Sequence, residues 1–158
     1  MKKDILVPFD GSHNALEALR LAANLAKLLQ EKLIVLNVQP SFRTAHTKVF
    51  FGEATIRDYQ QHLFEEVIVS AKSILEQAGV EYELKLRIGD AKDQICQEAG
   101  IRDSVPEGES CLPDGVRMII MGSRGMNPML GGVLGSVSYG VLNVAQCPVT
   151  IVPYSCPE

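Results

Sequence analysis

Short apolar runs that suit buried strands alternate along the chain with segments in which apolar residues recur at helical spacing. This alternation is typical of βα units in a parallel sheet, because a crossover between parallel strands is usually a helix. Right-handed crossovers place helices on both faces of such a sheet. The sequence therefore predicts an α/β fold, a single-domain, doubly wound, five-stranded parallel sheet over residues 1–158. Strands are expected at residues 4–9, 33–39, 81–88, 116–121 and 149–153, and helices at 12–30, 56–78, 90–99 and 136–145.

Two of these helices have a clear apolar face. The face of the first helix is Leu16, Leu19, Ala22, Ala23, Ala26 and Leu29, and that of the long second helix is Ile56, Tyr59, Leu63, Val67, Ala71, Ile74 and Ala78. Gly79 is expected to end the long helix as a C-cap glycine. Asp90, followed by Asp93, places acceptors at the start of the short third helix. The strand at 81–88 alternates less cleanly and is expected nearer the sheet edge.

Two segments lack a helical or strand period and are expected to be surface loops. Residues 41–52 show no clear pattern, and residues 101–115 contain two prolines, two glycines and several acidic residues. No internal repeat and no domain boundary is visible.

Composition is that of a globular protein of about one domain, with 158 residues, 46% hydrophobic and 22% charged. The net charge of −4 and the absence of a basic run argue against a nucleic-acid partner. The first residues lack the long apolar stretch of a signal peptide, and no segment is long enough to cross a bilayer. We therefore expect a cytoplasmic protein with no membrane partner.

The four cysteines, Cys96, Cys111, Cys147 and Cys156, are far apart and form no C-x-x-C pair. We interpret them as reduced thiols of a cytoplasmic protein. A disulfide or redox switch that involves Cys156 is the alternative.

The segment from Met121 to Asn143, MGSRGMNPMLGGVLGSVSYGVLN, leaves a predicted strand, crosses a glycine-rich loop and enters a helix. Glycines allow backbone N–H groups to approach an anion, and a helix N-terminus adds unpaired donors. Gly122 and Gly125 are expected to shape the turn, and Gly135 and Ser136 to supply donors at the helix start. The segment therefore predicts a phosphate site.

Other interpretations of this loop stay open. Glycine-rich connections also occur as plain turns, and the fork of Arg124 could contact a phosphate or face solvent. The loop is neither a Walker A loop nor a G-x-G-x-x-G fingerprint, because it has no G-K-[ST] triplet and the two glycine clusters are too far apart.

Gly122-x-x-Gly125, nine residues, then Gly135-Ser136 resembles the G-2x-G-9x-G-[ST] signature of the ATP-binding universal stress proteins. The opening residues ILVPFDGS and the later GSVS and CPV segments are similar to other parts of that family, so the resemblance covers nearly the whole chain. It implies a Rossmann-like sheet of the adenine nucleotide alpha hydrolase-like kind and a homodimer formed through the last strand. It also implies ATP, or ADP or AMP, bound with Mg²⁺ that is held mainly by the phosphates.

The resemblance also implies a role for individual positions. Asp10, after the first strand, would lie near adenosine and the metal, and Val38 would contact adenine through its backbone. The remaining positions that would line the nucleotide are Pro8, Met121, Gly122, Arg124, Gly125, Gly135, Ser136, Val137 and Ser138. The chain departs from the family pattern in two places, because no acidic residue is obvious at Val116-Arg117 and the loop at 101–115 is long.

Local interpretations compete with some of these roles. A carboxylate at the end of a strand can accept a hydrogen bond from ribose or help to hold Mg²⁺, but Asp10 before Gly11 could also form an Asx turn. Ser12 could be the N-cap of the first helix, and Ser136 could combine a cap with a ligand role.

Candidates for catalysis are few. Asp10, Ser12 and His13 are too close in sequence for a triad geometry, and His46 and His62 have no partner at metal-ligand spacing. Slow ATP hydrolysis or autophosphorylation at Ser136 or Ser138 is compatible with the site, although nothing marks an activated nucleophile. The favoured function is an ATP-dependent stress-response or regulatory module. The alternatives are a slow ATP hydrolase or phosphotransferase, and a flavin protein with a related sheet.

Overall fold

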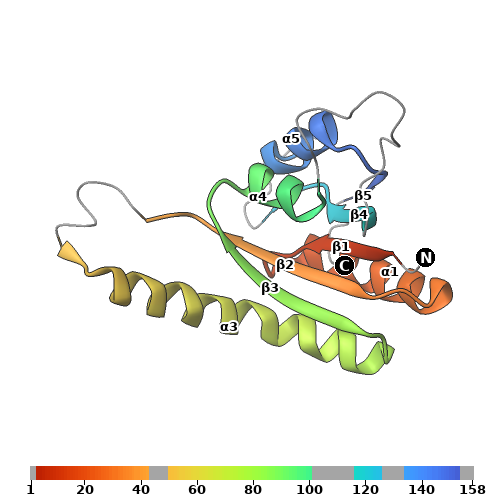
Figure 1. Cartoon of the computed structure of the whole chain (residues 1–158). Helices are drawn as coiled ribbons and strands as arrows, with labels where there is room; N and C mark the ends of the chain where they lie inside the picture. Colours follow the sequence, from red (N-terminus) through yellow and green to blue (C-terminus); the bar gives the residue numbers. More distant parts are fainter. Residues whose placement is uncertain (1–2, 43–49, 101–115, 126–133, 154–158) are drawn as a thin grey trace.

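The structure is a computed structural model that describes residues 3–42, 50–100, 116–125 and 134–153 (Figure 1). The described residues form an α/β fold around a five-stranded parallel sheet, which confirms the predicted fold class. The strands are β1 (Asp4–Pro8), β2 (Leu33–Gln39), β3 (Tyr82–Ile88), β4 (Val116–Gly122) and β5 (Val149–Val152). The helices are α1 (His13–Leu29), α3 (Glu53–Ala78), α4 (Ala91–Glu98) and α5 (Ser136–Val144).

The strand order is β3-β2-β1-β4-β5, so the chain builds outward from β1 in one direction and then crosses to its other side. The order therefore reverses between β1 and β4, which pair in parallel with Leu6 opposite Ile119. Ligands of such sheets bind beyond the carboxyl ends of the strands at this reversal. The prediction that the strand at 81–88 lies near an edge is confirmed, because β3 is an edge strand.

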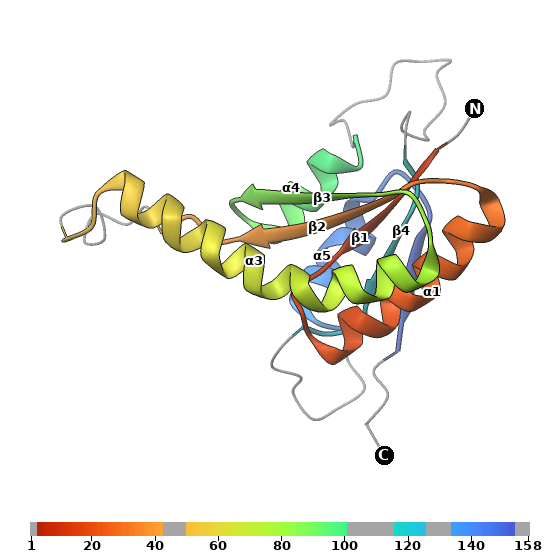
Figure 2. The ribbon, with the colours of Figure 1, turned by 90° about the horizontal axis from the view of Figure 1, so that it is seen from below.

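Helices cover both faces of the sheet, and each face has its own core (Figures 1 and 2). Figure 2 shows α1 and α3 together on one face, where Leu19 and Leu75 pack against Val7 and Val35. On the other face Ile95 of α4 and Val141 of α5 pack against Leu6, Leu36 and Ile119. The alternation of side chains along β1 and β2 divides their residues between the two cores.

Three helix caps lie at the positions that the sequence predicts. The Ser12 hydroxyl accepts from the Ala15 N–H at the start of α1, and the Asp90 carboxylate accepts from the Asp93 N–H at the start of α4. Gly79 ends α3 in the left-handed region at φ 66°. Gln30 ends α1 with φ 56°, a conformation that sequence reasoning did not assign to a glutamine.

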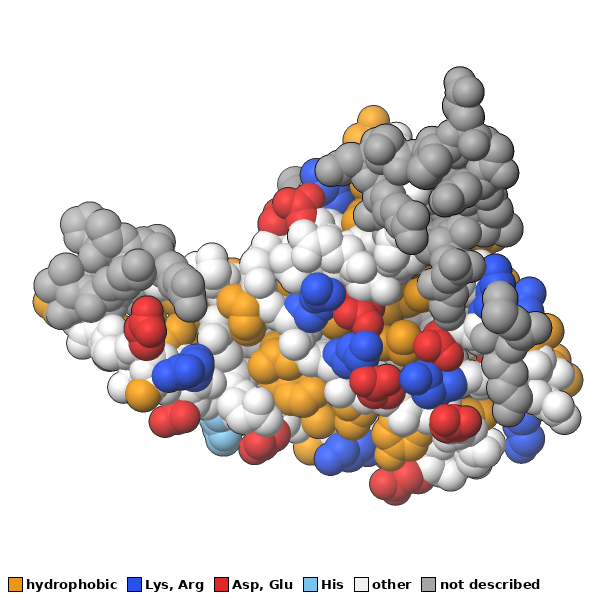
Figure 3. Space-filling model, in the orientation of Figure 1, with side chains coloured by type: hydrophobic (Ala, Val, Ile, Leu, Met, Phe, Trp, Pro, Cys, Tyr) orange, Lys and Arg blue, Asp and Glu red, His pale blue; other side chains and the backbone are white. Residues whose placement is uncertain are grey.

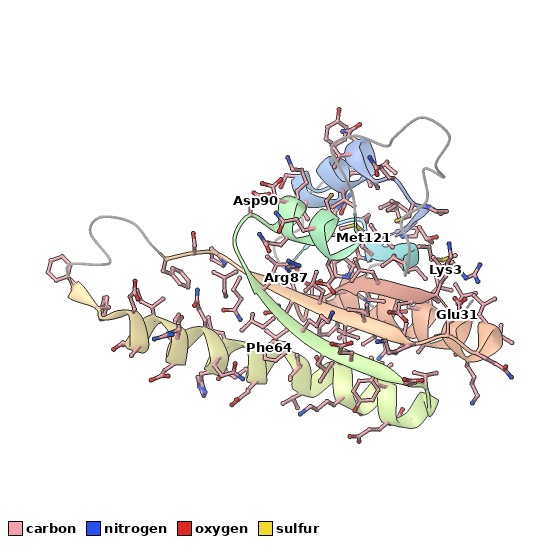
Figure 4. All side chains as sticks on the ribbon, viewed as in Figure 1. Lys3, Glu31, Phe64, Arg87, Asp90 and Met121 are labelled. Atoms are coloured by element: carbon pink, nitrogen blue, oxygen red, sulfur yellow. The ribbon has the colours of Figure 1, made fainter. Side chains whose placement is uncertain are left out.

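The predicted apolar faces of α1 and α3 need correction. Leu29 is 44% exposed and Tyr59 is 54% exposed, so neither lies on the buried face. The buried positions of α3 are Gln60, Phe64, Ile68, Ala71 and Leu75. Figure 4 shows Phe64 pointing from α3 toward the sheet. Helical period located both helices, but the contacts of each helix with the sheet decide which stripe is buried.

The two sheet edges differ in charge. On β3, Lys85 and Arg87 both bind the Glu98 carboxylate of α4, at 2.6 Å and 2.9 Å, and Glu83 binds Lys32 at 3.1 Å. Figure 3 shows Lys and Arg side chains interleaved with Asp and Glu side chains over this part of the surface. The other edge strand, β5, has the uncharged sequence VTIV.

Two of the four cysteines lie in the described part of the chain, and both Cys96 and Cys147 are buried free thiols. Burial raises the pKa of each thiol above its ordinary value. Cys111, Cys156 and the loop predicted at 101–115 lie outside the described residues. In the described ranges no helix is long and apolar enough to span a bilayer.

Candidate functional site

The segments that follow β1 and β4 meet at the reversal of strand order. A Cβ atom built on Gly125, after β4, would lie 3.0 Å from Oδ2 of Asp10, which follows β1. Asp10 and Gly125 are both exposed, whereas Phe9, just before Asp10, is buried. Asp10 and the glycine-rich segment are thus brought together at the edge of the sheet where ligands of this fold bind.

Asp10 and Ser12 make local bonds that shape the turn into α1. The Ser12 N–H donates to Asp10 Oδ1 at 2.9 Å, which is an Asx turn, and the Ser12 hydroxyl accepts from the Ala15 N–H at 3.1 Å. The turn and cap interpretations of these two residues are therefore correct. The Asx turn uses Oδ1 of Asp10, and the other carboxylate oxygen, Oδ2, is the one nearer to Gly125.

The loop after β4 is fastened to α1 and to β5. The Ser123 N–H donates to the Val152 carbonyl at 2.9 Å, and the Arg124 N–H donates to Oδ1 of Asn14 at 3.0 Å. The Ser123 hydroxyl donates to the same oxygen of Asn14 at 3.1 Å. The backbone at Arg124 is therefore held by the protein itself.

The start of α5 corrects one expectation about donors. The Gly135 N–H donates to the Ser123 carbonyl at 2.7 Å, so it is committed within the protein and not offered to a phosphate. The first bond within α5 runs from the Tyr139 N–H to the Gly135 carbonyl at 2.9 Å. The amides of Ser136, Val137 and Ser138 precede this bond, and no side chain caps the helix. These three amides are the donors that the helix start provides.

The two serines of α5 differ in their surroundings. Ser136 is exposed, whereas Ser138 is 4% exposed and its hydroxyl donates to the Gly122 carbonyl at 2.8 Å. The Ser138 hydroxyl thus joins α5 to the end of β4, and only its backbone amide belongs to the uncapped turn.

The apolar candidates lie on the α4 and α5 face of the sheet. Met121 is 5% exposed within the core of that face (Figure 4), and Val38 and Val137 pack against the same core. Pro8, the last residue of β1, is half-buried and pairs with Leu36 of β2. The ends of β1, β2 and β4 therefore contribute a continuous edge beside the start of α5.

Each glycine of the signature lies where another part of the chain approaches closely. A Cβ on Gly122 would lie 2.7 Å from Cγ of Asn14, and a Cβ on Gly135 would lie 3.3 Å from the Ser123 carbonyl oxygen. The Gly125 position faces Asp10, as described above. A side chain at Gly135 would therefore press on the loop itself.

Metal-ligating side chains do not cluster within the described ranges, where no group of three or more His, Cys, Asp or Glu residues could hold an ion. His62 lies 3.3 Å from Glu66 on the exposed surface of α3. His46 lies outside the described residues. A Mg²⁺ ion at this edge would need oxygen ligands from a bound phosphate, with the Asp10 carboxylate as the adjacent protein group.

Asn14 is the residue of this site that sequence reasoning missed. It is 1% exposed, and its amide contacts both the loop after β4 and the end of β5. One signal in the sequence could have identified it, because Asn14 lies four and eight residues before Ala18 and Ala22, on the buried stripe of α1. A polar residue on a buried stripe usually has a specific partner.

Comparison with known proteins shows what the chain is similar to. The model of the universal stress protein family matches residues 1–103 and 114–153. The universal stress protein Sll1654 of Synechocystis is 29% identical over 159 residues, which cover 97% of this chain and 87% of that protein. The solved structure of hypothetical protein MJ0577 has a TM-score of 0.78 and 25% identity, with 99% of each chain covered.

Two further structures of the same fold contain adenine nucleotides. The universal stress protein from Archaeoglobus fulgidus in complex with dAMP has a TM-score of 0.63 and 23% identity, with 96% of this chain and 98% of that chain covered. A universal stress protein family protein from Arabidopsis thaliana with AMP bound has a TM-score of 0.62 and 21% identity, with 98% and 93% covered.

Proposed function

We propose that this chain, which belongs to the universal stress protein family, binds ATP and acts as a stress-response or regulatory module. The nucleotide would lie beyond the carboxyl ends of β1, β2 and β4. Its phosphates would accept hydrogen bonds from the first turn of α5.

One observation supports the proposal above the others. The uncapped amides of Ser136, Val137 and Ser138 follow Gly135, which lies against the loop of Ser123 and Arg124, and Gly125 of that loop lies beside Asp10. Hydrogen bonds to a charged group are worth about 1.5–3 kcal/mol each, so a few amides can hold a phosphate without a basic patch. The net charge of −4 is therefore compatible with binding ATP.

The nucleotide-bound relatives support the choice of ligand. The A. fulgidus and A. thaliana proteins bind dAMP and AMP, respectively, and share this fold. ATP, ADP or AMP would be the physiological nucleotide here. Mg²⁺ would be held mainly by the phosphates, with Asp10 as its candidate protein ligand. The buried free thiols of Cys96 and Cys147 suit the reducing cytoplasm that we propose as the location of the protein.

The proposed assembly is a homodimer formed through β5. The Ile119 N–H donates to the Pro148 carbonyl and the Ser123 N–H donates to the Val152 carbonyl. Because backbone groups alternate in direction along a strand, those of Val149 and Ile151 face away from β4. Edge strands need protection, and β3 has charged side chains that β5 lacks. A second copy that pairs with β5 would cover this edge.

A proline at the first helical position gives a sharp test of the site. Ser136→Pro removes one of the three amides, and proline is well tolerated at that position of a helix. The backbone of Gly135, with φ −64° and ψ 159°, suits a residue that precedes proline. Ser136→Ala is the matched control, because it removes only the hydroxyl.

Isothermal titration with ATP, ADP and AMP should show one nucleotide per chain. Loss of one charge-assisted bond should make Ser136→Pro bind ATP about 10- to 150-fold more weakly than Ser136→Ala. Mass spectrometry of ligand released from freshly purified protein would identify the occupant. Absence of adenine nucleotide binding, or equal affinity of the two variants, would contradict the proposal, and repeated rapid release of phosphate from ATP would indicate an enzyme instead.

A further inference from the structure

Asn14 has an unusual position for an amide side chain. It is the second residue of α1, yet it is 1% exposed. A buried amide destabilises a protein unless its donors and acceptor are paired. The partners of Asn14 therefore indicate why it is buried here.

The partners of Asn14 come from two distant parts of the chain. Nδ2 donates to the carbonyls of Val152, at 3.1 Å, and Pro153, at 3.3 Å, at the end of β5. Oδ1 accepts from the Ser123 hydroxyl at 3.1 Å and the Arg124 N–H at 3.0 Å. The carbonyls can only accept and the backbone N–H can only donate, so these partners fix the orientation of the amide.

Gly122 makes this arrangement possible. A Cβ at Gly122 would lie 2.7 Å from Cγ and 2.8 Å from Oδ1 of Asn14. The end of β4 thus approaches the amide closely. From there the Ser123 carbonyl accepts from the Gly135 N–H, which joins the same loop to the start of α5.

We propose that Asn14 is a positioning residue that fastens the loop of Ser123 and Arg124 to the end of β5 and thereby sets the geometry of the nucleotide site. This inference rests on the proposed function for its effect on affinity. The fastening itself can be measured without nucleotide. Asn14 does not touch the phosphates in this proposal; it acts through the Arg124 backbone and the contact of Ser123 with α5.

Asn14→Asp should break the contact with the end of β5 while it keeps the contact with the Arg124 N–H. The variant keeps the shape of the side chain and an oxygen for the Arg124 N–H, but it places a second carboxylate oxygen against the two carbonyls of β5. Glu31→Gln is the matched control, because it also removes buried hydrogen bonds but lies at the opposite end of the sheet, beside Lys3 (Figure 4).

With AMP and ATP as probes, the affinity of Asn14→Asp for each nucleotide should be lower than that of the wild type by a factor of about ten or more. The affinity of Glu31→Gln for each nucleotide should stay within about twofold of that of the wild type. This should hold even if its melting temperature falls as much as that of Asn14→Asp. A folded Asn14→Asp protein with wild-type affinity would overturn the proposal.

Amide hydrogen exchange keeps the fastening testable if nucleotide does not bind or if the variant does not fold. In the nucleotide-free wild type the Arg124 amide should be protected from exchange, and in folded Asn14→Leu, which offers that amide no acceptor, its protection should fall while that of the α3 amides stays. An unprotected Arg124 amide in the wild type would refute the fastening. Protection of Arg124 without any adenine nucleotide binding would refute only the proposed function.

Discussion

At the residue scale, Gly122 shows that a signature glycine can serve the fold before it serves a ligand. Its neighbour in the fold is Asn14, whose Cγ would lie 2.7 Å and whose backbone carbon would lie 3.1 Å from an added Cβ. Because backbone atoms are involved, the clash cannot be relieved by rotating a flexible side chain. The glycine therefore permits the contact between α1 and the loop after β4.

Gly122→Ala should lower the free energy of unfolding by about 1–3 kcal/mol, which is the usual cost of overpacking. Urea denaturation at pH 7 measures this loss. Gly52→Ala is the control, because nothing lies within 4 Å of the added Cβ, and its cost should stay below about 1 kcal/mol. Equal stability of Gly122→Ala and the wild type would mean that Asn14 does not approach Gly122 as described.

The ion pair between Glu31 and Arg117 gives a second prediction at this scale. The Glu31 side chain is 3% exposed, and the Arg117 guanidinium donates to both of its carboxylate oxygens, with Nε at 2.7 Å from Oε2. The hydrogen bonds from Arg117 lower the pKa of Glu31 below its ordinary value of 4.5. Ionised Glu31 therefore stabilises the folded chain above pH 4.5, and this contribution is lost as the pH falls through the lower folded pKa.

Glu31→Gln should lower the melting temperature at pH 7 by roughly 2–5 °C. The gap between wild type and variant should stay constant down to about pH 5 and shrink below pH 4.5, as differential scanning calorimetry can measure. Glu66→Gln is the control, because Glu66 pairs with His62 on the surface, where ion pairs contribute little. A gap that widened toward acid pH would contradict a pKa of Glu31 that is lower in the folded chain than its ordinary value.

At the element scale, the start of α1 depends on one buried cap. Ser12 is 6% exposed and its hydroxyl accepts from the Ala15 N–H at 3.1 Å. Ser12→Ala should lower the free energy of unfolding by about 1–2 kcal/mol because the Ala15 donor loses its partner in a buried place. Denaturation with urea measures this change, and Ser12→Thr, which keeps a hydroxyl, should recover most of the loss. Failure of threonine to recover stability would point to a packing defect.

Local signals in the sequence were enough to locate the elements. The strand at Leu33–Gln39 and the cap at Gly79 agree with prediction, since aliphatic runs and a C-cap glycine act within a few residues. The buried stripe of α3 was misplaced at Tyr59, because which stripe is buried depends on how the helix crosses the sheet. Gln60, which is buried and donates to the Pro40 carbonyl, illustrates this dependence.

In the candidate site, too, short-range patterns located the elements but did not predict the contacts between distant segments. The glycine spacing located the loop and the start of α5, but it did not show that the Gly135 amide is bonded to Ser123 or that Asn14 holds Arg124. Both contacts join segments that no short-range pattern connects. The pairing of Glu31 with Arg117, 86 residues apart, escaped sequence analysis for the same reason.

At the scale of the whole molecule, the unequal sheet edges indicate which edge the proposed homodimer would use. The outward backbone groups of β5 face away from β4 without charged side chains beside them, whereas β3 is lined by Glu83, Lys85 and Arg87. Lysine on an edge strand opposes pairing, because association would desolvate its ammonium group and, in a two-fold dimer, bring two like charges together. A charge placed on β5 should therefore separate a dimer that uses this edge.

Thr150→Lys is the suitable change, since Thr150 is the polar residue of β5 and is half-buried. Sedimentation velocity should show a dimer for the wild type and mainly monomer for Thr150→Lys at the same concentration. Val69→Lys on α3, where Val69 is 66% exposed, adds the same charge and should remain dimeric. A wild-type monomer, or an undiminished Thr150→Lys dimer, would exclude β5 as the interface.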